Sequence, residues 1–203
     1  MRYLDFLVNT DQKRTLNAPQ AVETGLLRAN ITAQNGDQIK SRYDVLFTPG
    51  NSFGHMTGGF DLAVVDVFGR EIQTKVLRMI REKYAGMMPV GAAEVVVHDE
   101  RAVVYVPTMF APTSNVDPIA PYMAMHNALR ALAEYEEDNN AYFDRALVPL
   151  FCTGTANIPH EVALFQQNEA LVEFQRARHQ EDLGCLHLFD DGMARYNALI
   201  QPR

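Results

Sequence analysis

The residues best suited to chemistry lie in a glycine-rich loop, residues 49–61, with the sequence PGNSFGHMTGGFD. The loop follows a strand-like run, residues 44–47, and it holds four glycines, the amide of Asn51 and the carboxylate of Asp61. Glycine accepts positive φ angles and lacks a Cβ, so backbone N–H groups can approach an anionic oxygen closely. A helix that begins after the loop adds unpaired N–H donors and the positive end of its dipole. The loop therefore predicts an anion site that needs no lysine, as for a nucleotide-like ligand.

A second loop of the same kind, residues 152–159, follows the apolar run 146–151 and has helical sequence beyond it. Its Pro159 suits the first turn of a helix. Glycine pairs alone mark turns more often than ligand sites, and the first loop matches neither G-x-G-x-x-G nor G-x-x-x-x-G-K-[ST]. Two such loops at the carboxyl ends of strands define the crevice in which α/β sheets usually bind ligands. The pair of loops, more than either alone, indicates a binding site.

The elements that must position these loops alternate between apolar runs and helical patterns, which predicts an α/β protein with a mostly buried sheet. A hairpin around Asp99 and Glu100 makes the sheet mixed, and residues 9–24 are expected to form a loop or a short helix. Helices are expected at Asp66–Tyr84, Asp117–Glu136 and His160–Arg178. Strands are expected at Tyr3–Val8, Gly25–Ile31, Asp44–Phe47, Ala92–His98, Ala102–Pro107, Ala146–Phe151 and Gly184–Phe189.

Composition and charge limit the class of protein. With 203 residues, of which 47% are hydrophobic and 21% charged, and without a repeat or linker, the chain is expected to form one domain, residues 1–203. A net charge of −7 and a pI near 5.3 disfavour nucleic acid as a partner. An acid at position 5, and no run approaching the roughly 20 apolar residues of a membrane span, predict a cytoplasmic protein without a membrane partner. Cys152 and Cys185 are expected to be reduced thiols.

Four segments in series carry a resemblance to a known family. Asn51 and Asp61 stand ten residues apart around the glycines of the first loop. The other three segments are the second loop through Thr153, Gly154 and Pro159, the run Ala29-Asn30-Ile31-Thr32, and Leu186 to Asp191 followed by Tyr196 and Leu199. In these motifs the chain resembles the macro domain family, ADP-ribose-binding modules whose members include hydrolases of ADP-ribosyl bonds. The resemblance implies a three-layer α/β/α fold with a mixed, roughly six-stranded sheet.

The resemblance also implies roles for particular residues. Asp61 would help to position or deprotonate a water and Asn51 would orient the distal ribose, which makes them the catalytic candidates. Each has a structural alternative, because a strand-end Asn ties down its own turn and an acid at a helix N-terminus is worth ~0.3–1 kcal/mol. Phe189 resembles the aromatic that packs on adenine, and its alternative is a core position. The implied ligand-binding set is Asn30, Ile31, Asn51, Gly58, Gly59, Phe60, Thr153, Gly154, Thr155, Ala156, Asn157, Ile158 and Phe189.

Three residues depart from the family pattern. Asn30 stands where the family commonly has an aspartate, although an asparagine can also pair with adenine. Ala156 replaces a bulky residue that covers the diphosphate, and Asn157 replaces a glycine, which Asn can do because it enters the left-handed region comparatively easily. These departures predict a more open pocket that excludes water less well. They also sustain a second hypothesis, a non-catalytic binding or assembly protein with the same fold.

Other chemistries find little support in the sequence. His55 and His160 flank the two loops, but no Cys/His or carboxylate cluster has metal-ligand spacing, and no nucleophilic triad is present. No metal and no cofactor is therefore expected. The predicted function is binding of ADP-ribose or a related NAD-derived nucleotide, with hydrolysis of an ADP-ribosyl bond as its extension. The predicted partners are that small nucleotide and an ADP-ribosylated macromolecule.

Overall fold

The computed structural model describes residues 3–7, 22–24, 27–32, 39, 42–179 and 192–201, with backbone only for 22–24, 27–32 and 179. The predicted strand Gly184–Phe189, including Phe189, lies outside these residues. Seven strands are β1 (Tyr3–Leu7), β2 (Val22–Thr24), β3 (Leu27–Thr32), β4 (Val45–Asn51), β5 (Glu94–His98), β6 (Arg101–Met109) and β7 (Arg145–Pro149). The main helices are α3 (Gly59–Phe68), α4 (Glu71–Tyr84), α5 (Ala120–Asp138), α6 (His160–His179) and α8 (Gly192–Ile200).

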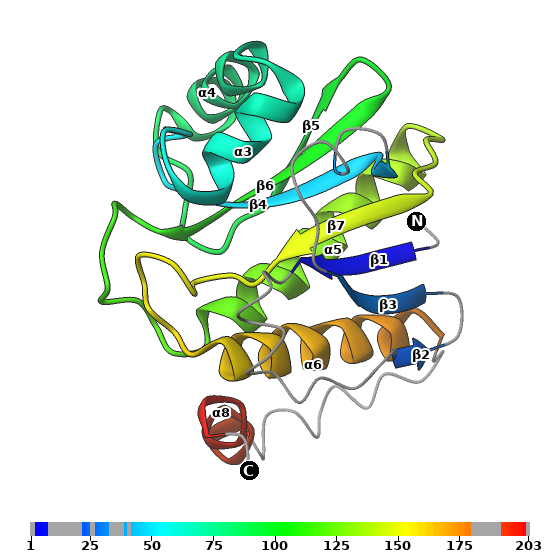
Figure 1. The fold of residues 1–203 in the computed structure, drawn as a ribbon, viewed down its shortest axis with the longest axis vertical. Helices are drawn as coiled ribbons and strands as arrows, with labels where there is room; N and C mark the ends of the chain where they lie inside the picture. Colours follow the sequence, from blue (N-terminus) through cyan, green and yellow to red (C-terminus); the bar gives the residue numbers. More distant parts are fainter. Residues whose placement is uncertain are drawn as a thin grey trace.

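The strands form one mixed sheet in the order β2-β3-β1-β7-β4-β6-β5 (Figure 1). The five central strands are parallel, while β2 and β5 pair antiparallel at the two edges. The predicted mixed sheet is confirmed, with one strand more than the roughly six expected. The additional strand is β2, which lies within residues 9–24, where a loop or short helix was predicted.

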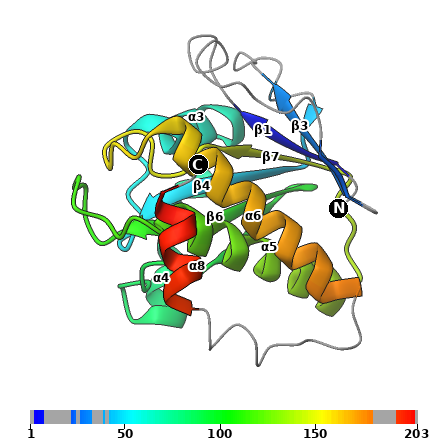
Figure 2. The ribbon, with the colours of Figure 1, turned by 90° about the horizontal axis from the view of Figure 1, so that it is seen from below.

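Helices cover both faces of the sheet, as the predicted three-layer α/β/α arrangement requires (Figures 1 and 2). On one face Val45, Phe47 and Val104 pack with residues of α5 and α6. On the other face Leu46 and Val103 pack with residues of α3 and α4. Successive strand residues point to opposite faces of the sheet. Because helices cover both faces, the central strands need apolar residues at nearly every position, as their near-continuous apolar runs show. Helix α8 packs against α6.

The single helix predicted at Asp66–Tyr84 is wrong, because the chain breaks there into α3 and α4. Gly69 ends α3 with φ 87°, and its N–H donates to the carbonyl of Val65 at 2.7 Å. The apolar spacing of Phe68 and Ile72 continues across this break, so periodicity alone did not reveal it. The predicted helices that became α5 and α6 are confirmed to within three residues at either end.

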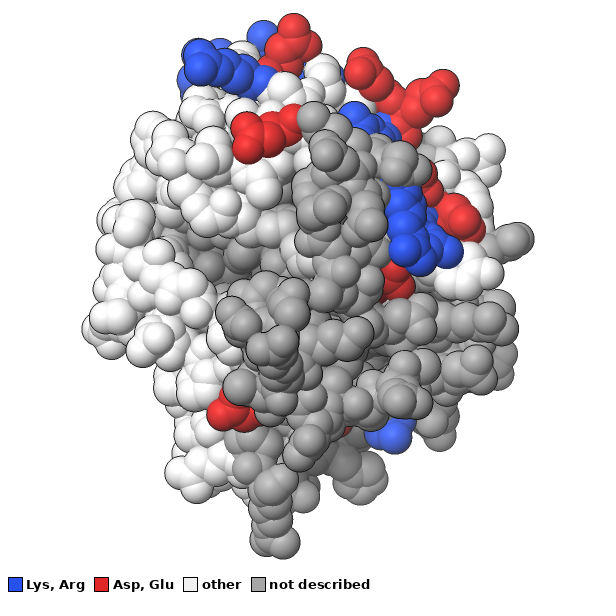
Figure 3. Space-filling view, in the orientation of Figure 1, with Lys and Arg blue, Asp and Glu red and all other residues white. Residues whose placement is uncertain are grey.

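The described surface carries charges of both signs. In the view of Figure 3, basic and acidic side chains are intermixed along the upper edge, and this face shows no broad basic field among its described atoms. Within the described ranges, no helix is both long enough and apolar enough to cross a bilayer. Of the two cysteines, Cys152 is buried as a free thiol. Cys185 lies outside the described residues.

Candidate functional site

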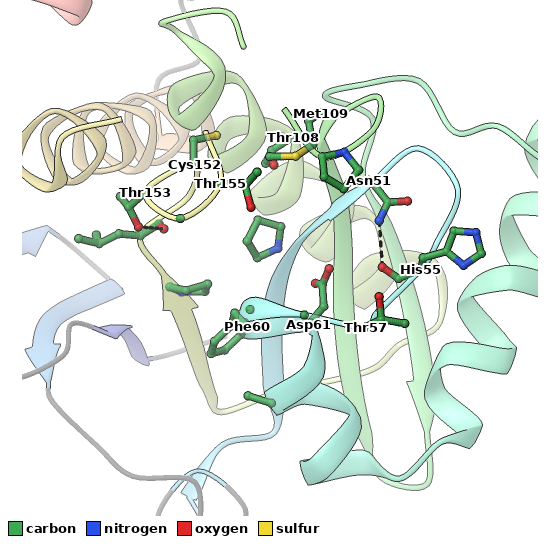
Figure 4. A pocket seen from close by; sticks show the side chains of 18 of the residues that line it. Asn51, His55, Thr57, Phe60, Asp61, Thr108, Met109, Cys152, Thr153 and Thr155 are labelled. Carbon is green, nitrogen blue, oxygen red and sulfur yellow. Dashed lines mark hydrogen bonds between the residues drawn. The ribbon is translucent and has the colours of Figure 1, made fainter. Parts of the chain in front are cut away.

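A cavity of about 1010 Å³ lies where β4, β6 and β7 end, and residues of both predicted loops line it (Figure 4). Its volume is at the upper end of the roughly 300–1,000 Å³ typical of small-molecule sites. Asn51 and residues 57–61 contribute from the first loop, and residues 152–155 contribute from the second. The end of β6 adds Thr108 and Met109 between them. The parallel strand order β7-β4-β6 brings these carboxyl ends to one edge of the sheet.

The N-terminus of α3 opens into this cavity without a side-chain cap. Gly58 is the N-cap residue, with φ −160° and ψ 167°, and it has no side chain to accept a hydrogen bond from the first turn. The N–H groups of Gly59, Phe60 and Asp61 fall in that first turn, where intrahelical acceptors do not exist. A Cβ at Gly58 or at Gly59 would have no neighbour within 4 Å. The helix end therefore offers open backbone donors and a positive dipole to an anion.

The second loop leaves β7 and turns sharply. Cys152 and Asn157 both adopt left-handed backbone conformations, with φ 62° and 57°, as the substitution of Asn for Gly at position 157 allows. The loop closes on itself when the N–H of Asn157 donates to Gly154 O and the N–H of Ile158 donates to Cys152 O, both at 2.9 Å. Gly154 and Thr155 lie on the cavity wall, and the N–H groups of these two residues take no part in the two loop-closing hydrogen bonds. Figure 4 shows Thr155 and Asp61 pointing toward the same space from the two loops.

Asn51 builds the first loop with both of its side-chain atoms. Its Oδ1 accepts from the N–H of Phe53 at 3.0 Å, and its Nδ2 donates to the carbonyl of His55 at 2.9 Å (Figure 4). This is the structural alternative weighed for Asn51, a strand-end amide that ties down its own turn. The loop is further fixed by Tyr105, which packs so closely over Gly50 that a Cβ there would lie 2.2 Å from the tyrosine hydroxyl.

Asp61 places a buried carboxylate on the cavity wall. Only 7% of the residue is exposed, and Thr48 Oγ1 donates a hydrogen bond to its Oδ1 at 2.5 Å. Burial raises the pKa of Asp61 to about 7, because the charged form loses hydration, while the Thr48 hydrogen bond opposes the shift. Asp61 is the only side chain with a formal charge among the described lining residues. A carboxylate with a pKa near 7 can exchange protons at neutral pH.

Two buried groups at the cavity were not among the predicted site residues, Thr108 and the thiol of Cys152. The Oγ1 of Thr108 lies 3.5 Å from the carbonyl oxygen of Gly50, and the same side chain hydrogen-bonds Cys152. Thr108 therefore joins the loop roots, the strand ends from which the two loops leave the sheet. Burial raises the pKa of the Cys152 thiol to about 12, with the Thr108 hydrogen bond opposing the shift. A thiol with this pKa stays protonated at neutral pH and is inert as a nucleophile. The sequence placed Cys152 near the site, but nothing in it showed that β6 runs beside β4.

The other predicted residues are placed by the structure as follows. Asn30 and Ile31 lie in β3, where Asn30 pairs with Asp5 and Ile31 with Phe6, and only their backbone is described. Ala156 is buried in the core with 5% exposure, so the described cavity wall does not include it. Asn157 and Ile158 are likewise absent from that wall.

The histidines beside the loops do not converge on a metal site. The imidazole of His55 lies on the outer side of its loop, away from the centre of the cavity (Figure 4). His160 begins α6. Among the described residues, no group of three or more His, Cys, Asp or Glu side chains is arranged to hold a metal ion.

Comparison with known proteins places this arrangement in a family. The chain matches the family model described as Macro-like domain over residues 32–175, and it therefore belongs to the macro-like domain family. The matched range contains both loops, the uncapped end of α3 and every described lining residue of the cavity except Leu7. The resemblance found in the sequence motifs is thereby confirmed.

Solved macrodomain structures share the fold at low sequence identity. The macrodomain of Mycobacterium tuberculosis DarG aligns with a TM-score of 0.53 and 16% identity over 72% of this chain and 90% of that one. A mutant macrodomain of Oceanobacillus iheyensis with ADPR aligns with a TM-score of 0.54 and 18% identity over 66% of this chain and 72% of that one. Thermosipho africanus DarTG in complex with ADP-ribose aligns with a TM-score of 0.51 and 14% identity over 66% of this chain and 36% of that one. At these identities the likeness is one of fold.

Proposed function

We propose that this macro-like domain binds ADP-ribose or a related NAD-derived nucleotide in the cavity between the first loop and the second. The observation that supports the proposal most strongly is that both loops line one cavity into which the uncapped N-terminus of α3 opens. A diphosphate fits these donors, because its oxygens accept hydrogen bonds from backbone N–H groups on either side. The solved relatives with ADPR or ADP-ribose in their structures support the same ligand class.

Calorimetry with ADP-ribose tests the binding proposal directly. We expect saturable heat and an increase in Tm, since a ligand that binds the folded state stabilises it by mass action. Ribose 5-phosphate, which lacks the diphosphate, serves as the control ligand and is expected to bind far more weakly. The absence of both heat and a thermal shift at millimolar ADP-ribose contradicts the proposal.

Hydrolysis of an ADP-ribosyl bond is the finer part of the proposal. Asp61 would take a proton from a water whose oxygen attacks C1″ of the distal ribose. The bond from C1″ to the acceptor group breaks, and the acceptor leaves with the proton that Asp61 received, which restores the carboxylate. Asp61 suits this role because its pKa of about 7 matches neutral conditions and its carboxylate lies on the cavity wall. Incubation with an ADP-ribosylated peptide should release ADP-ribose, and Asp61→Ala should abolish the release.

A non-catalytic reader of ADP-ribosylated macromolecules is the second candidate function. The side chain of Asn51 supports it, because both of its polar atoms already hold the loop, which is a structural role that needs no substrate. Binding of ADP-ribose that persists in Asp61→Ala, with no release of ADP-ribose from a modified peptide, selects this candidate.

A further inference from the structure

The first loop is held at its root by a tyrosine outside the cavity. Tyr105, in β6, is fully buried, and its hydroxyl makes two hydrogen bonds with the main chain of Asn51. It accepts from the N–H of Asn51 at 3.1 Å and donates to the carbonyl of the same residue at 2.6 Å. These bonds lie where the β4–β6 pairing shifts register, between Gly50 and Asn51. The tyrosine thus replaces the partner that regular strand pairing would supply.

The second loop is held in the same way by a glutamine of α6. Gln167 is fully buried, its Oε1 accepts from the N–H of Phe151 at 2.8 Å, and its Nε2 donates to the carbonyl of Pro149 at 3.0 Å. Pro149 is the last residue of β7, where its pairing with Leu7 of β1 ends. Gln167 therefore provides hydrogen-bond partners for one N–H and one carbonyl at the end of β7, where strand pairing no longer provides them.

We propose that Tyr105 and Gln167 are positioning residues for the ligand site, each fixing one of the two loops in the geometry that ligand binding requires. Neither side chain is part of the described cavity wall, so each acts through the backbone that it holds. Buried N–H and carbonyl groups that lose their partners are costly, so a loop root without its partner moves to find another. Backbone donors that shift by about 1 Å no longer meet a bound anion at hydrogen-bond distance. In enzymes, a misplacement of this size can lower the rate of the catalysed reaction about a hundredfold.

The chain supplies a matched control for each residue. Tyr43 is a second buried tyrosine, and its hydroxyl donates to Asp5 at 2.8 Å outside the cavity. Gln166 precedes Gln167 on the same helix and is equally buried, but its Nε2 donates to Pro118 O at 2.9 Å and to Leu199 O at 3.0 Å. The substitutions Tyr43→Phe and Gln166→Leu therefore remove comparable buried hydrogen bonds without touching either loop root.

The experiment compares Tyr105→Phe and Gln167→Leu with these two controls. All four variants are expected to lose thermal stability. Affinity for ADP-ribose is expected to fall about tenfold or more in Tyr105→Phe and Gln167→Leu and to stay within about twofold of the parent in the controls. Equal losses of affinity in the controls, or unchanged affinity in the two test variants, overturn the proposal.

A conservative variant separates positioning from general stability. The protonated acid in Gln167→Glu has the shape of the amide, and it keeps an acceptor for Phe151 N–H and a donor for Pro149 O. Gln167→Glu should therefore bind ADP-ribose nearly as well as the parent at acid pH and lose affinity as the buried acid ionises. An affinity that stays flat with pH, or is already lost at acid pH, contradicts the role given to Gln167.

The ligand measurements rest on the proposed function, and amide hydrogen exchange tests the proposal without it. Faster exchange is expected at Phe53 and Gly54 in Tyr105→Phe and at Asn157 and Ile158, whose N–H groups bond within the second loop, in Gln167→Leu. No change at these amides is expected in the controls. If the parent protein does not bind ADP-ribose, only the proposed ligand is wrong, and the exchange rates still test whether Tyr105 and Gln167 position the loops. Unchanged exchange in both loops overturns the positioning role itself.

Discussion

Thr48 donates a hydrogen bond from its hydroxyl to Oδ1 of Asp61 at 2.5 Å, and the two side chains are almost completely buried. The hydrogen bond favours the carboxylate form and burial favours the acid form. Burial wins, because the pKa of Asp61 rises to about 7 despite the hydrogen bond. The protonation of Asp61 therefore links the stability of the fold to the charge of the cavity wall.

The stability of the fold should fall as the pH rises from about 4 to about 7. In the unfolded chain the pKa of Asp61 returns to the ordinary value of 3.8, whereas in the folded chain the carboxyl holds its proton up to about pH 7. The folded state therefore binds more protons in this window, and the free energy of unfolding declines with pH until it levels off above 7. Asp61→Asn, which stays neutral, should be more stable than the parent above pH 7 by up to roughly 4 kcal/mol. Urea unfolding at pH 5 and pH 8 checks this, and identical pH slopes for parent and variant contradict it.

Removing the hydroxyl of Thr48 should raise the pKa of Asp61 beyond its present value. Thr48→Val keeps the shape of the side chain but removes the hydrogen bond that opposes burial. We expect the pKa to rise by about one, as for the loss of one hydrogen bond to a charged group. Titration of the Asp61 carboxyl carbon by NMR measures it directly. Thr108→Val removes a different buried hydroxyl at the cavity and should leave the Asp61 titration in place.

Much of the fold and part of the site could be predicted from local patterns. The apolar strand runs and the stripes of α5 and α6 were visible because burial against a neighbour imposes a period on the sequence. The order of strands in the sheet was not visible, because it depends on which distant runs pair. Tyr105 and Gln167 therefore escaped prediction, since each meets its loop only through the packing of β6 and α6. That Asn51 ties down its own turn was anticipated as an alternative, but the use of both of its polar atoms was not. The helix break at Gly69 was missed because the apolar spacing continues across it.

Filling the open space at the glycines of the cavity should block the ligand without harming the fold. Gly58 and Gly154 both line the cavity, have ordinary φ angles, and leave the space of a Cβ empty to 4 Å. Gly58→Val and Gly154→Val are therefore expected to change stability by less than about 1 kcal/mol and to weaken ADP-ribose binding about tenfold or more. Gly192→Val is the control, because Gly192 has the same open space and ordinary φ but is not part of the described cavity wall. Calorimetry on all three variants checks this, and equal binding by Gly154→Val and Gly192→Val contradicts it.

Gly50 should be intolerant of even one methyl group. A Cβ at this position would lie 2.2 Å from the hydroxyl oxygen of Tyr105 and 2.3 Å from Cζ of its ring. The tyrosine cannot yield freely, because its hydroxyl is bonded to both main-chain groups of Asn51. Gly50→Ala is expected to destabilise the protein by roughly 1–3 kcal/mol, as overpacking does. Chemical unfolding measures the loss, and Gly58→Ala, whose Cβ meets open space, should show no such loss.

Binding of ADP-ribose should respond weakly to salt, and in an unusual direction. No lysine or arginine lines the described cavity, and the donors that we propose for the anion are the backbone N–H groups of α3 and the second loop. Neutral donors at short range are little screened, whereas the net charge of −7 repels an anionic ligand from a distance until salt screens it. Raising the salt from about 50 to about 500 mM is therefore expected to change the Kd by less than about threefold, with any change toward tighter binding. Calorimetry across this range checks it. A tenfold loss of affinity would mean that a cationic side chain outside the described residues holds the diphosphate, and that the backbone cradle is not its main support.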